Sequence, residues 1–342
     1  MRRTGRRVPL AEEFGAVLRV FHSHPNLPAA GRGGAVALGN FDGVHHGHRA
    51  IFRETRAAAE RLGVAAGVVT FEPHPRSVLR PDAPPFRLTT LATKARALAD
   101  LGLDMMVVVR FDHAFSQQSA AEFVQRVVVD ALGARHVVVG EDFRFGRGRT
   151  GTPTNLESAG KTAGFGVTIL PEVTHTEGDI FSSSNIRHAL REGQPEYAAR
   201  LLGRWWEIEA NVLEGDRRGR TIGYPTANLD LGELLHPALG VYAVRVAVTE
   251  YVDEPDENLR WLDAVANVGW RPTVGGQDLR LEVHIFDFDG DLYGRTLRAR
   301  FITHIRPERR FNGLDELKEQ IGRDAATARQ RLAEAPDAPP SP

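Results

Sequence analysis

The hydrophobic pattern of the chain changes near Arg204, and this change limits the folds that the chain can adopt. Before Arg204, short apolar runs alternate with stretches of helical period, a pattern typical of parallel strands joined by crossover helices. After it, regularly spaced runs of alternating apolar and polar residues follow one another without helices between them, which indicates an antiparallel sandwich or small closed barrel. Because 342 residues also exceed one ordinary domain, we expect two domains.

The first domain, predicted over residues 1–187, is expected to be a doubly wound, Rossmann-like α/β fold. Its expected strands are Ala35–Leu38, Ala66–Phe71, Met105–Phe111, His136–Val139 and Gly166–Ile169. Its expected helices are Ile51–Leu62, Leu91–Leu101, Ala120–Leu132 and Leu156–Gly164. Thr154 is a suitable N-cap for the last helix, and residues 1–34 are expected to form an edge element followed by a loop.

The second domain, predicted over residues 188–334, begins in a helical joint, Ile186 to Gly203, that Gly193 and Pro195 interrupt. Six antiparallel strands are expected at Trp206–Leu213, Ile222–Leu229, Val241–Val248, Leu262–Val268, Leu281–Phe286 and Arg298–Ile305. One helix, Leu314 to Leu332, closes the domain. The tail at 335–342 is rich in proline and is predicted to be disordered.

The composition favours a cytoplasmic enzyme or binding protein that acts on small molecules. With 43 basic and 44 acidic residues, the chain has no bulk field to attract nucleic acid or an anionic membrane. No stretch has the roughly 20 apolar residues that cross a bilayer, and the basic start is not followed by the apolar core of a secretory signal. The absence of cysteine excludes disulfides and thiolate chemistry. A monomer and a transient homo-oligomer both stay open.

A glycine- and histidine-rich turn, Gly39 to His48, joins an apolar run to a helical stretch. In such a turn, the unpaired backbone N–H groups at the start of the helix can bind a phosphate, and the helix dipole favours its negative charge. His45 and His48 are three residues apart and should project to one side, with Gly47 leaving space for a ligand between them. A metal site or a merely tight connection is the alternative, but no cysteine and no nearby carboxylate pair completes a metal site.

A second polar stretch, Phe181 to Arg187, follows the last expected crossover of the first domain. Its serines and the guanidinium of Arg187 stand at the start of another helix, where they can grip a polyphosphate. A serine run in this position is more often only an N-cap. Ligands of open α/β sheets bind at the carboxyl ends of the strands, so this stretch is expected at the same sheet edge as Gly39 to His48.

The barrel half contains a glycine-bearing basic loop, Gly215 to Leu229. Backbone N–H groups of such a loop can wrap phosphates, and Thr226 and Asn228 offer two neutral oxygens on one face of a strand, which suit Mg²⁺. A surface hairpin with a tight Tyr-Pro turn is the alternative.

The two stretches of the first half, Gly39–His48 and Ser182–Arg187, resemble the signatures of the nucleotidylyltransferase superfamily, and most closely the adenylyltransferase domain of prokaryotic bifunctional riboflavin kinase/FAD synthetases. Thr70 to Pro75, Phe115 to Phe123 and Gly140 to Gly146 are similar to further motifs of that domain. Ser184 stands where threonine is common and keeps the hydroxyl.

This resemblance implies transfer of AMP from ATP to FMN. His45 and His48 would stabilise the ATP phosphates, and Arg187 would stabilise the leaving pyrophosphate. The remaining residues expected to bind the nucleotide are Gly39, Asn40, Phe41, Asp42, Gly43, Gly47, Ser182, Ser183 and Ser184. Asp142 and Phe143 are candidate flavin-binding residues; buried loop anchors are the alternative.

The stretch Gly215–Leu229 resembles the phosphate loop and the Pro-Thr-Ala-Asn signature of riboflavin kinases, which are six-stranded antiparallel barrels. The resemblance implies that Gly219, Arg220, Gly223 and Pro225 bind ATP and that Thr226 and Asn228 bind Mg²⁺. The stretches Ala266–Thr273, Leu281–His284 and Arg306–Phe311 resemble further motifs of that family. By its position in Leu281–His284, Glu282 would be the general base for the riboflavin 5′-hydroxyl, and His284, two residues on, would share its face of the strand. Arg217 replaces a glycine of the kinase pattern, which could stiffen the loop or add charge for ATP.

Together the two resemblances imply a bifunctional enzyme that makes FMN from riboflavin and FAD from FMN, with ATP as the donor in both steps. Two other classes stay open. The first domain could adenylylate another phosphorylated acceptor, because FMN is inferred only from the attached kinase. The chain could also be a flavin or nucleotide sensor, although the intact set of expected catalytic residues argues against a sensor.

Overall fold

The computed structural model describes residues 12–14, 18–22, 26–174, 180–213, 223–249, 256–273 and 276–339. The chain divides into two compact units. The first consists of Met1–Pro84 and Lys94–Thr174, and the second of Pro85–Thr93 and His175–Pro342. The short segment 85–93 therefore belongs to the second unit, although it lies within the first half of the sequence.

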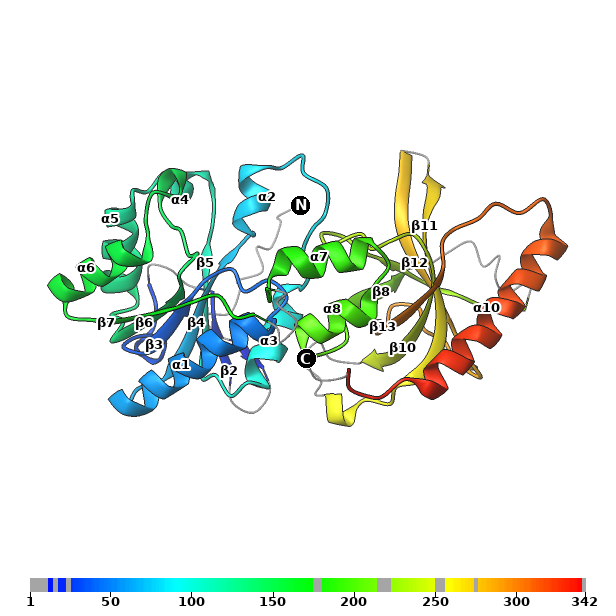
Figure 1. The fold of residues 1–342 in the computed structure, drawn as a ribbon, viewed down its shortest axis with the longest axis horizontal. Coiled ribbons are helices and arrows are strands. Elements are labelled where there is room, and N and C mark those ends of the chain that lie inside the picture. The colour runs from blue at the N-terminus through cyan, green and yellow to red at the C-terminus, as the bar shows by residue number, and fades with distance from the viewer. Residues whose placement is uncertain are drawn as a thin grey trace, which may run out of the picture. The chain divides into compact units, whose positions relative to one another are not determined.

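The first unit is a seven-stranded sheet with helices on both faces, as the alternating pattern predicted (Figure 1). Its strands, in spatial order, are β1 (Glu12–Phe14), β2 (Leu18–Phe21), β5 (Met105–Arg110), β4 (Ala66–Glu72), β3 (Ala35–Leu38), β6 (His136–Gly140) and β7 (Gly166–Leu170). All neighbours from β2 to β7 are parallel, and β1 pairs antiparallel with β2 at the edge. The expected edge element is this β1–β2 pair.

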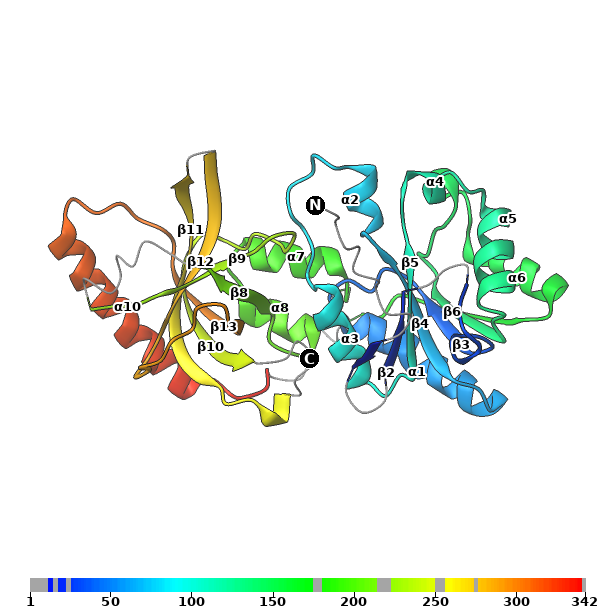
Figure 2. The same ribbon diagram turned by 180° about the vertical axis from the view of Figure 1, so that it is seen from behind.

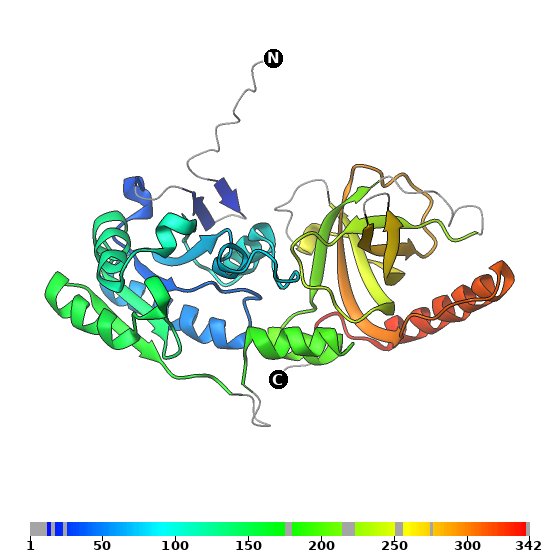
Figure 3. The ribbon, with the colours of Figure 1, turned by 90° about the horizontal axis from the view of Figure 1, so that it is seen from above.

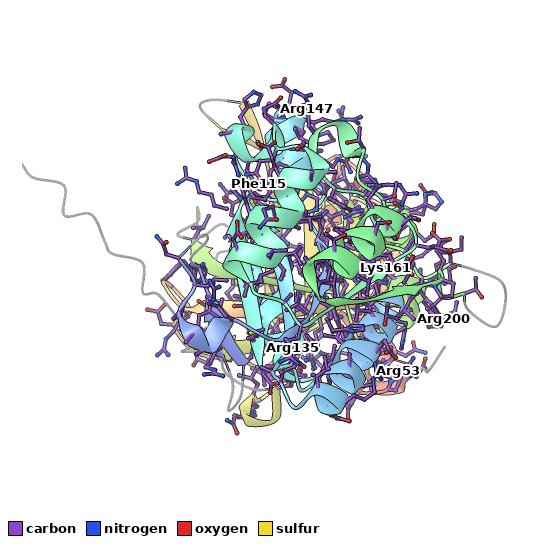
Figure 4. The ribbon with its side chains drawn as sticks, turned by 90° about the vertical axis from the view of Figure 1, so that its left-hand side faces the viewer. Arg53, Phe115, Arg135, Arg147, Lys161 and Arg200 are labelled. Carbon is purple, nitrogen blue, oxygen red and sulfur yellow. The ribbon has the colours of Figure 1, made fainter. Side chains whose placement is uncertain are left out.

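The helices of the first unit are α1 (His46–Leu62), α2 (Pro75–Leu79), α3 (Leu91–Ala99), α4 (His113–Ser116), α5 (Ala120–Phe123) and α6 (Pro153–Ala163). Helix α1 packs on β3, β4 and β6. Side chains of α6 and of the segment after α5 pack with those of the strands in one apolar cluster. Figure 4 views the unit from the side of α5 and α6.

One local prediction in this unit was wrong, and another was right about the helix but not about its winding. The cap of α6 is Thr152 rather than Thr154, because Pro153 suits the first helical position and the Thr152 side chain accepts a hydrogen bond from the Asn155 N–H. The helix expected over Ala120–Leu132 divides at Phe123, since Val124–Ala131 has the wider π-helical winding.

The strand order reverses at β3, because the chain proceeds from β3 through β4 to β5 on one side and continues with β6 and β7 on the other. In open α/β sheets this reversal opens a crevice at the carboxyl ends of the two central strands. The turn after β3 and the loop after β6 both begin at this crevice.

The second unit is a closed six-stranded antiparallel barrel (Figure 2). Its strands, in spatial order, are β10 (Gly240–Thr249), β11 (Leu262–Thr273), β12 (Gly276–Ile285), β9 (Ala227–Asp230), β8 (Glu207–Leu213) and β13 (Thr296–Arg306). All six expected strands are present. The strand expected over Ile222–Leu229 begins only at Ala227 among the described residues. Residues 223–226 are not part of a strand, and they include Pro225, which lacks a ladder N–H. Ile222 itself lies outside the described residues.

The described part of the second unit also contains the α-helices α7 (Ser183–Arg191), α8 (Pro195–Leu202) and α10 (Leu314–Glu334) and a short 3-10 helix, Asp256–Asn258. The first two are the predicted joint, divided at Gly193. Helix α10 lies along the outside of the barrel against β10, β11 and β13 (Figure 3). Tail residues 335–337 accept hydrogen bonds from Arg245 and Trp205; residues 340–342 lie outside the described part, and the disorder predicted for the tail stays a prediction.

The segment 85–93 pairs with the barrel unit through its backbone. Arg87 exchanges two hydrogen bonds with the segment before β10, from its N–H to Glu233 O at 3.2 Å and from the Leu235 N–H to its own carbonyl at 2.8 Å. The indole N–H of Trp206 donates to Leu88 O at 3.0 Å. The predicted boundary at 187/188 does not account for this segment, which precedes the boundary in sequence but belongs to the barrel unit.

Candidate active sites

The turn after β3 lies at the crevice of the first unit and contains strained backbone. Phe41 and Val44 have left-handed backbones, with φ of 49° and 47°, and Gly43 has φ of 93°. A β-carbon on Gly39 would lie 2.8 Å from the ring of Phe41. Gly39 is therefore required for the ring of Phe41 to fold back over the end of β3.

The two histidines of this turn meet at the start of α1. His45 is the N-cap residue, and the rings of His45 and His48 stack with centroids 3.6 Å apart and planes 23° apart. Phe41 packs edge-on against His48 at 5.2 Å. The two imidazoles project to one side as expected, but the space expected between them is filled by their own stacking. A ligand must therefore approach the ring edges.

The start of α1 and the imidazole edges together can stabilise an anion. Backbone N–H groups in the first turn of a helix point away from the helix, and the dipole of the 17-residue α1 adds positive potential there. The expected nucleotide contacts of Asn40, Asp42 and Gly47 stay predictions.

The loop after β6 contains the two candidate flavin-binding residues, Asp142 and Phe143. Asp142 folds over its own strand end, where its Oδ1 would lie 2.8 Å from a β-carbon on Gly140. Phe143 stacks on the buried Phe145 with centroids 5.7 Å apart. Phe143 therefore packs as a loop anchor, and contact with a flavin stays a prediction for both residues.

The serine-rich motif belongs to the second unit. Ser182 caps α7, since its hydroxyl accepts a hydrogen bond from the Asn185 N–H at 3.1 Å, while Ser183 and Ser184 form the first helical turn. Arg187 donates from Nε to Phe86 O at 2.8 Å, and its guanidinium lies 5.5 Å from the Phe86 ring centroid. The segment 85–93 thus orients Arg187. That this motif shares one ligand with the histidine turn stays a prediction.

Three polar residues stand opposite one another on the adjacent strands β11, β12 and β9, which are labelled in Figure 2. Glu282 on β12 pairs in register with Asn267 on β11 and with Asn228 on β9. Directly paired residues share a face of the sheet. Asn228, Asn267 and Glu282 line a cavity of about 660 Å³, and Thr226 lines the same cavity.

The turn before β9 is held from the same face. His284 hydrogen-bonds through Nδ1 to Pro225 O at 2.8 Å, and its ring packs edge-on against Tyr224 at 5.2 Å. Gly223 has φ of 87°, which favours glycine. The expected ATP-binding residues Gly219 and Arg220, together with Arg217, lie outside the described residues.

The other wall of the cavity comes from α10 and the segment before it. Arg306 makes a bidentate ion pair with the buried Asp324, with nitrogen–oxygen distances from 2.7 to 3.1 Å. Phe311, Leu317 and Ile321 add apolar surface. A wall of this kind suits a planar ring system with polar edges.

A second carboxylate, Glu308, also lines the cavity. Partial burial raises the pKa of Glu308, and the neighbouring charge of Glu282 raises it further, against the lowering effect of Arg306. Sequence reasoning did not single out Asn267 or Glu308. Both residues lie within stretches, 266–273 and 306–311, that resemble kinase motifs. The resemblance pointed to these stretches but to neither residue in particular.

The donor set at this end of the cavity fits Mg²⁺. Thr226 and Asn228 offer neutral oxygens beside the carboxylate of Glu282, and Mg²⁺ binds few protein oxygens while keeping waters and substrate phosphates. Among the described residues, no group of three or more histidine and acidic side chains is arranged to hold a metal. Within the same part of the chain, no helix is long and apolar enough to span a membrane.

Comparisons with known proteins match both halves of the chain. The family model of FAD synthetase matches residues 27–185, and that of riboflavin kinase matches residues 202–332. A bifunctional riboflavin kinase/FMN adenylyltransferase from Escherichia coli strain K12 is 42% identical over 89% of this chain and 95% of its own length. One of the same name from Bacillus subtilis is 36% identical over 91% of this chain and 96% of its own length.

A solved structure has the same fold over nearly the whole chain. The crystal structure of a protein named Macrolide-efflux Protein, from Streptococcus pneumoniae, is 32% identical, with a TM-score of 0.77 over 92% of this chain and 99% of that chain. Its name differs from those of the two sequence relatives, whereas the two family models agree with the sequence relatives.

Proposed function

The chain belongs to the family of bifunctional riboflavin kinases/FMN adenylyltransferases, and we propose that it converts riboflavin to FMN in the barrel and FMN to FAD in a site that includes the turn after β3. The observation that carries the proposal is the register of Asn267, Glu282 and Asn228 across the barrel cavity. It supports Glu282 as the base and the neighbouring amide oxygens as neutral donors, because all three side chains line one cavity.

In the kinase step, Glu282 accepts the proton of the riboflavin 5′-hydroxyl as its oxygen attacks the γ-phosphorus of ATP. The bond from that phosphorus to the bridging oxygen breaks, and ADP leaves. The apolar wall of Phe311, Leu317 and Ile321 would bind the flavin ring. Thr226 and Asn228 would hold Mg²⁺, which supplies charge neutralisation for the transferred phosphoryl group.

In the adenylyl step, an FMN phosphate oxygen attacks the α-phosphorus of ATP, and pyrophosphate leaves. The FMN phosphate is already ionised, so the step needs no general base. The work of the protein is to position the two substrates and neutralise charge. We assign this work to the edges of His45 and His48, the start of α1 and Arg187.

We further propose that residues 1–187 form the FMN adenylyltransferase domain and residues 188–334 the riboflavin kinase domain, in a cytoplasmic enzyme whose partners are flavins and ATP rather than nucleic acid or membranes. FMN is favoured over another phosphorylated acceptor because the FAD synthetase and riboflavin kinase models match one chain. The intact Glu282 register favours an enzyme over a sensor.

The test is a product analysis of the purified protein. Incubation with riboflavin, ATP and Mg²⁺ is expected to give first FMN and then FAD, separated by chromatography and identified by their absorption and mass. Omission of Mg²⁺ should stop both steps. Absence of FMN would contradict the kinase assignment, and accumulation of FMN without FAD would contradict the adenylyltransferase assignment.

A further inference from the structure

One lysine of the first unit, Lys94, is buried beside the turn after β3. Lysine stands only at positions 94, 161 and 318, among 43 basic residues, so the chain uses arginine for nearly every cation. Lys161 and Lys318 are exposed on α6 and α10, and Figure 4 shows Lys161 on the outside of its helix. Lys94, in the first turn of α3, is 1% exposed.

The ammonium group of Lys94 binds the backbone from which the strained turn begins. Its Nζ donates to Asn40 O at 2.8 Å and to Thr70 Oγ1 at 3.0 Å, and lies 3.8 Å from Glu72 Oε1. The Thr70 hydroxyl donates to the same Asn40 carbonyl at 3.1 Å. Two donors from two other elements thus fix one carbonyl, all within the first unit.

This carbonyl immediately precedes the strained residue Phe41. A non-glycine residue with φ near 49° persists only where its surroundings hold it, because this conformation is costly for a residue with a β-carbon. Fixing Asn40 O fixes the peptide plane that leads into Phe41. The orientation of that plane determines where the following N–H groups point.

Lysine fits this position for reasons of geometry. A compact ammonium has three donors and can serve the Asn40 carbonyl, the Thr70 hydroxyl and the Glu72 carboxylate at once, whereas the planar guanidinium of arginine is larger. A buried ion is also weak support for stability, since apolar replacements of buried ion pairs are often neutral. A role in preorganising the turn accounts for its burial better than stability does.

We propose that Lys94 is a positioning residue for ATP in the adenylyl transfer, acting through the Asn40–Phe41 peptide. The inference rests on the proposed function of this turn. Lys94 is too buried to contact the nucleotide itself. It holds the backbone of the turn that would contact the nucleotide.

The experiment measures both half-reactions in Lys94→Met, which keeps the length of the side chain and removes its donors. The KM for ATP in FAD formation from FMN is expected to rise about tenfold or more, with kcat changed less than about threefold, because binding rather than chemistry is lost. Riboflavin phosphorylation by the same preparation should stay within about twofold of the unaltered enzyme. Lys161→Met, on the outer face of α6, is the matched control and should change neither reaction.

Thr70→Val separates positioning from charge, because it removes one donor to Asn40 O and no charge. It is expected to raise the KM for ATP about threefold, and combined with Lys94→Met it should add less than its separate effect. An unchanged KM in Lys94→Met would overturn the proposal, as would a parallel loss of both half-reactions. If Lys94→Met does not fold, an unchanged KM in Thr70→Val overturns it. Failure of the unaltered enzyme to make FAD would instead contradict the proposed function itself.

Discussion

At the scale of single residues, two carboxylates, Glu282 and Glu308, line the barrel cavity. Partial burial and the charge of Glu282 raise the pKa of Glu308, and Arg306 offsets part of this effect. Both raising causes favour the neutral form of the carboxyl. Glu308 therefore takes up its proton at a higher pH than an ordinary glutamate does.

The variant Glu282→Gln removes the charge that helps to raise the pKa of Glu308 and is expected to lower that pKa. Glu308 should then take up its proton at a lower pH than in the unaltered enzyme. The measurement is an NMR titration of the Glu308 carboxyl carbon in both proteins. A pKa of Glu308 that stays in place or rises would show that the two carboxylates do not interact.

The residues of the cavity also show what could and what could not be predicted from the sequence. Alternation along Leu281–His284 put Glu282 and His284 on one face, and the structure confirms this with both residues lining the cavity. Asn267 was not predicted as a partner of Glu282, because their pairing depends on the register of β11 against β12. Register is set by contacts between distant segments, which a local pattern does not contain.

At the scale of elements, α10 is anchored to the barrel by one arginine of β10. Arg245 donates to Leu332 O at 3.0 Å and to Ala335 O at 2.8 Å, and also to Pro336 O and Asp337 Oδ1, both at 3.0 Å. Carbonyls at a helix end have no partner within the helix, so a basic side chain there satisfies them. The first half of the same helix lines the cavity.

Arg245→Ala is therefore expected to destabilise the barrel unit by about 2 kcal/mol, the loss of a cluster of charge-assisted hydrogen bonds. All four tryptophans, 205, 206, 261 and 270, belong to this unit, so urea unfolding followed by tryptophan fluorescence measures it selectively. Arg245→Lys keeps the charge but lacks the planar guanidinium, so its unfolding midpoint should lie between those of the unaltered enzyme and of Arg245→Ala. A midpoint equal to that of the unaltered enzyme would contradict this anchoring.

The elements themselves were largely predictable, and the errors have physical causes. Strands such as Met105–Arg110 are buried on both faces of the parallel sheet. A strand in this position needs a continuous apolar run, which can be recognised in the sequence. The π-helical winding of Val124–Ala131 was not predicted, because its apolar spacing is close to that of an α-helix. The stacking of His45 on His48 was missed for another reason, since spacing gives a shared side but not ring orientation.

At the scale of the whole molecule, the two units are not two consecutive halves of the chain, because segment 85–93 belongs to the second unit. Segment 85–93 leaves the first half, pairs with the barrel unit at Glu233 and Leu235, and orients Arg187 through Phe86. It returns at Lys94, which holds the turn of the first unit. No hydrophobic period marks such a segment, so a sequence pattern places it in the first domain. A cut at 187/188 would separate segment 85–93 from Glu233 and Leu235, so we expect the barrel unit to lose stability when that segment is removed.

The central claim is that each conversion has its own site, one built on the turn after β3 and one in the barrel. His48→Ala removes a group proposed to stabilise the ATP phosphates and should lower FAD formation from FMN by about 100-fold or more, leaving riboflavin phosphorylation within about twofold. Glu282→Gln removes the proposed base and should lower riboflavin phosphorylation by about 100-fold or more, leaving FAD formation from supplied FMN within about twofold.

The most direct test is to assay both half-reactions on both variants in one series, with each flavin supplied separately. The account predicts a reciprocal pattern, in which each variant loses one half-reaction and retains the other. Equal loss of both half-reactions in either correctly folded variant would contradict it.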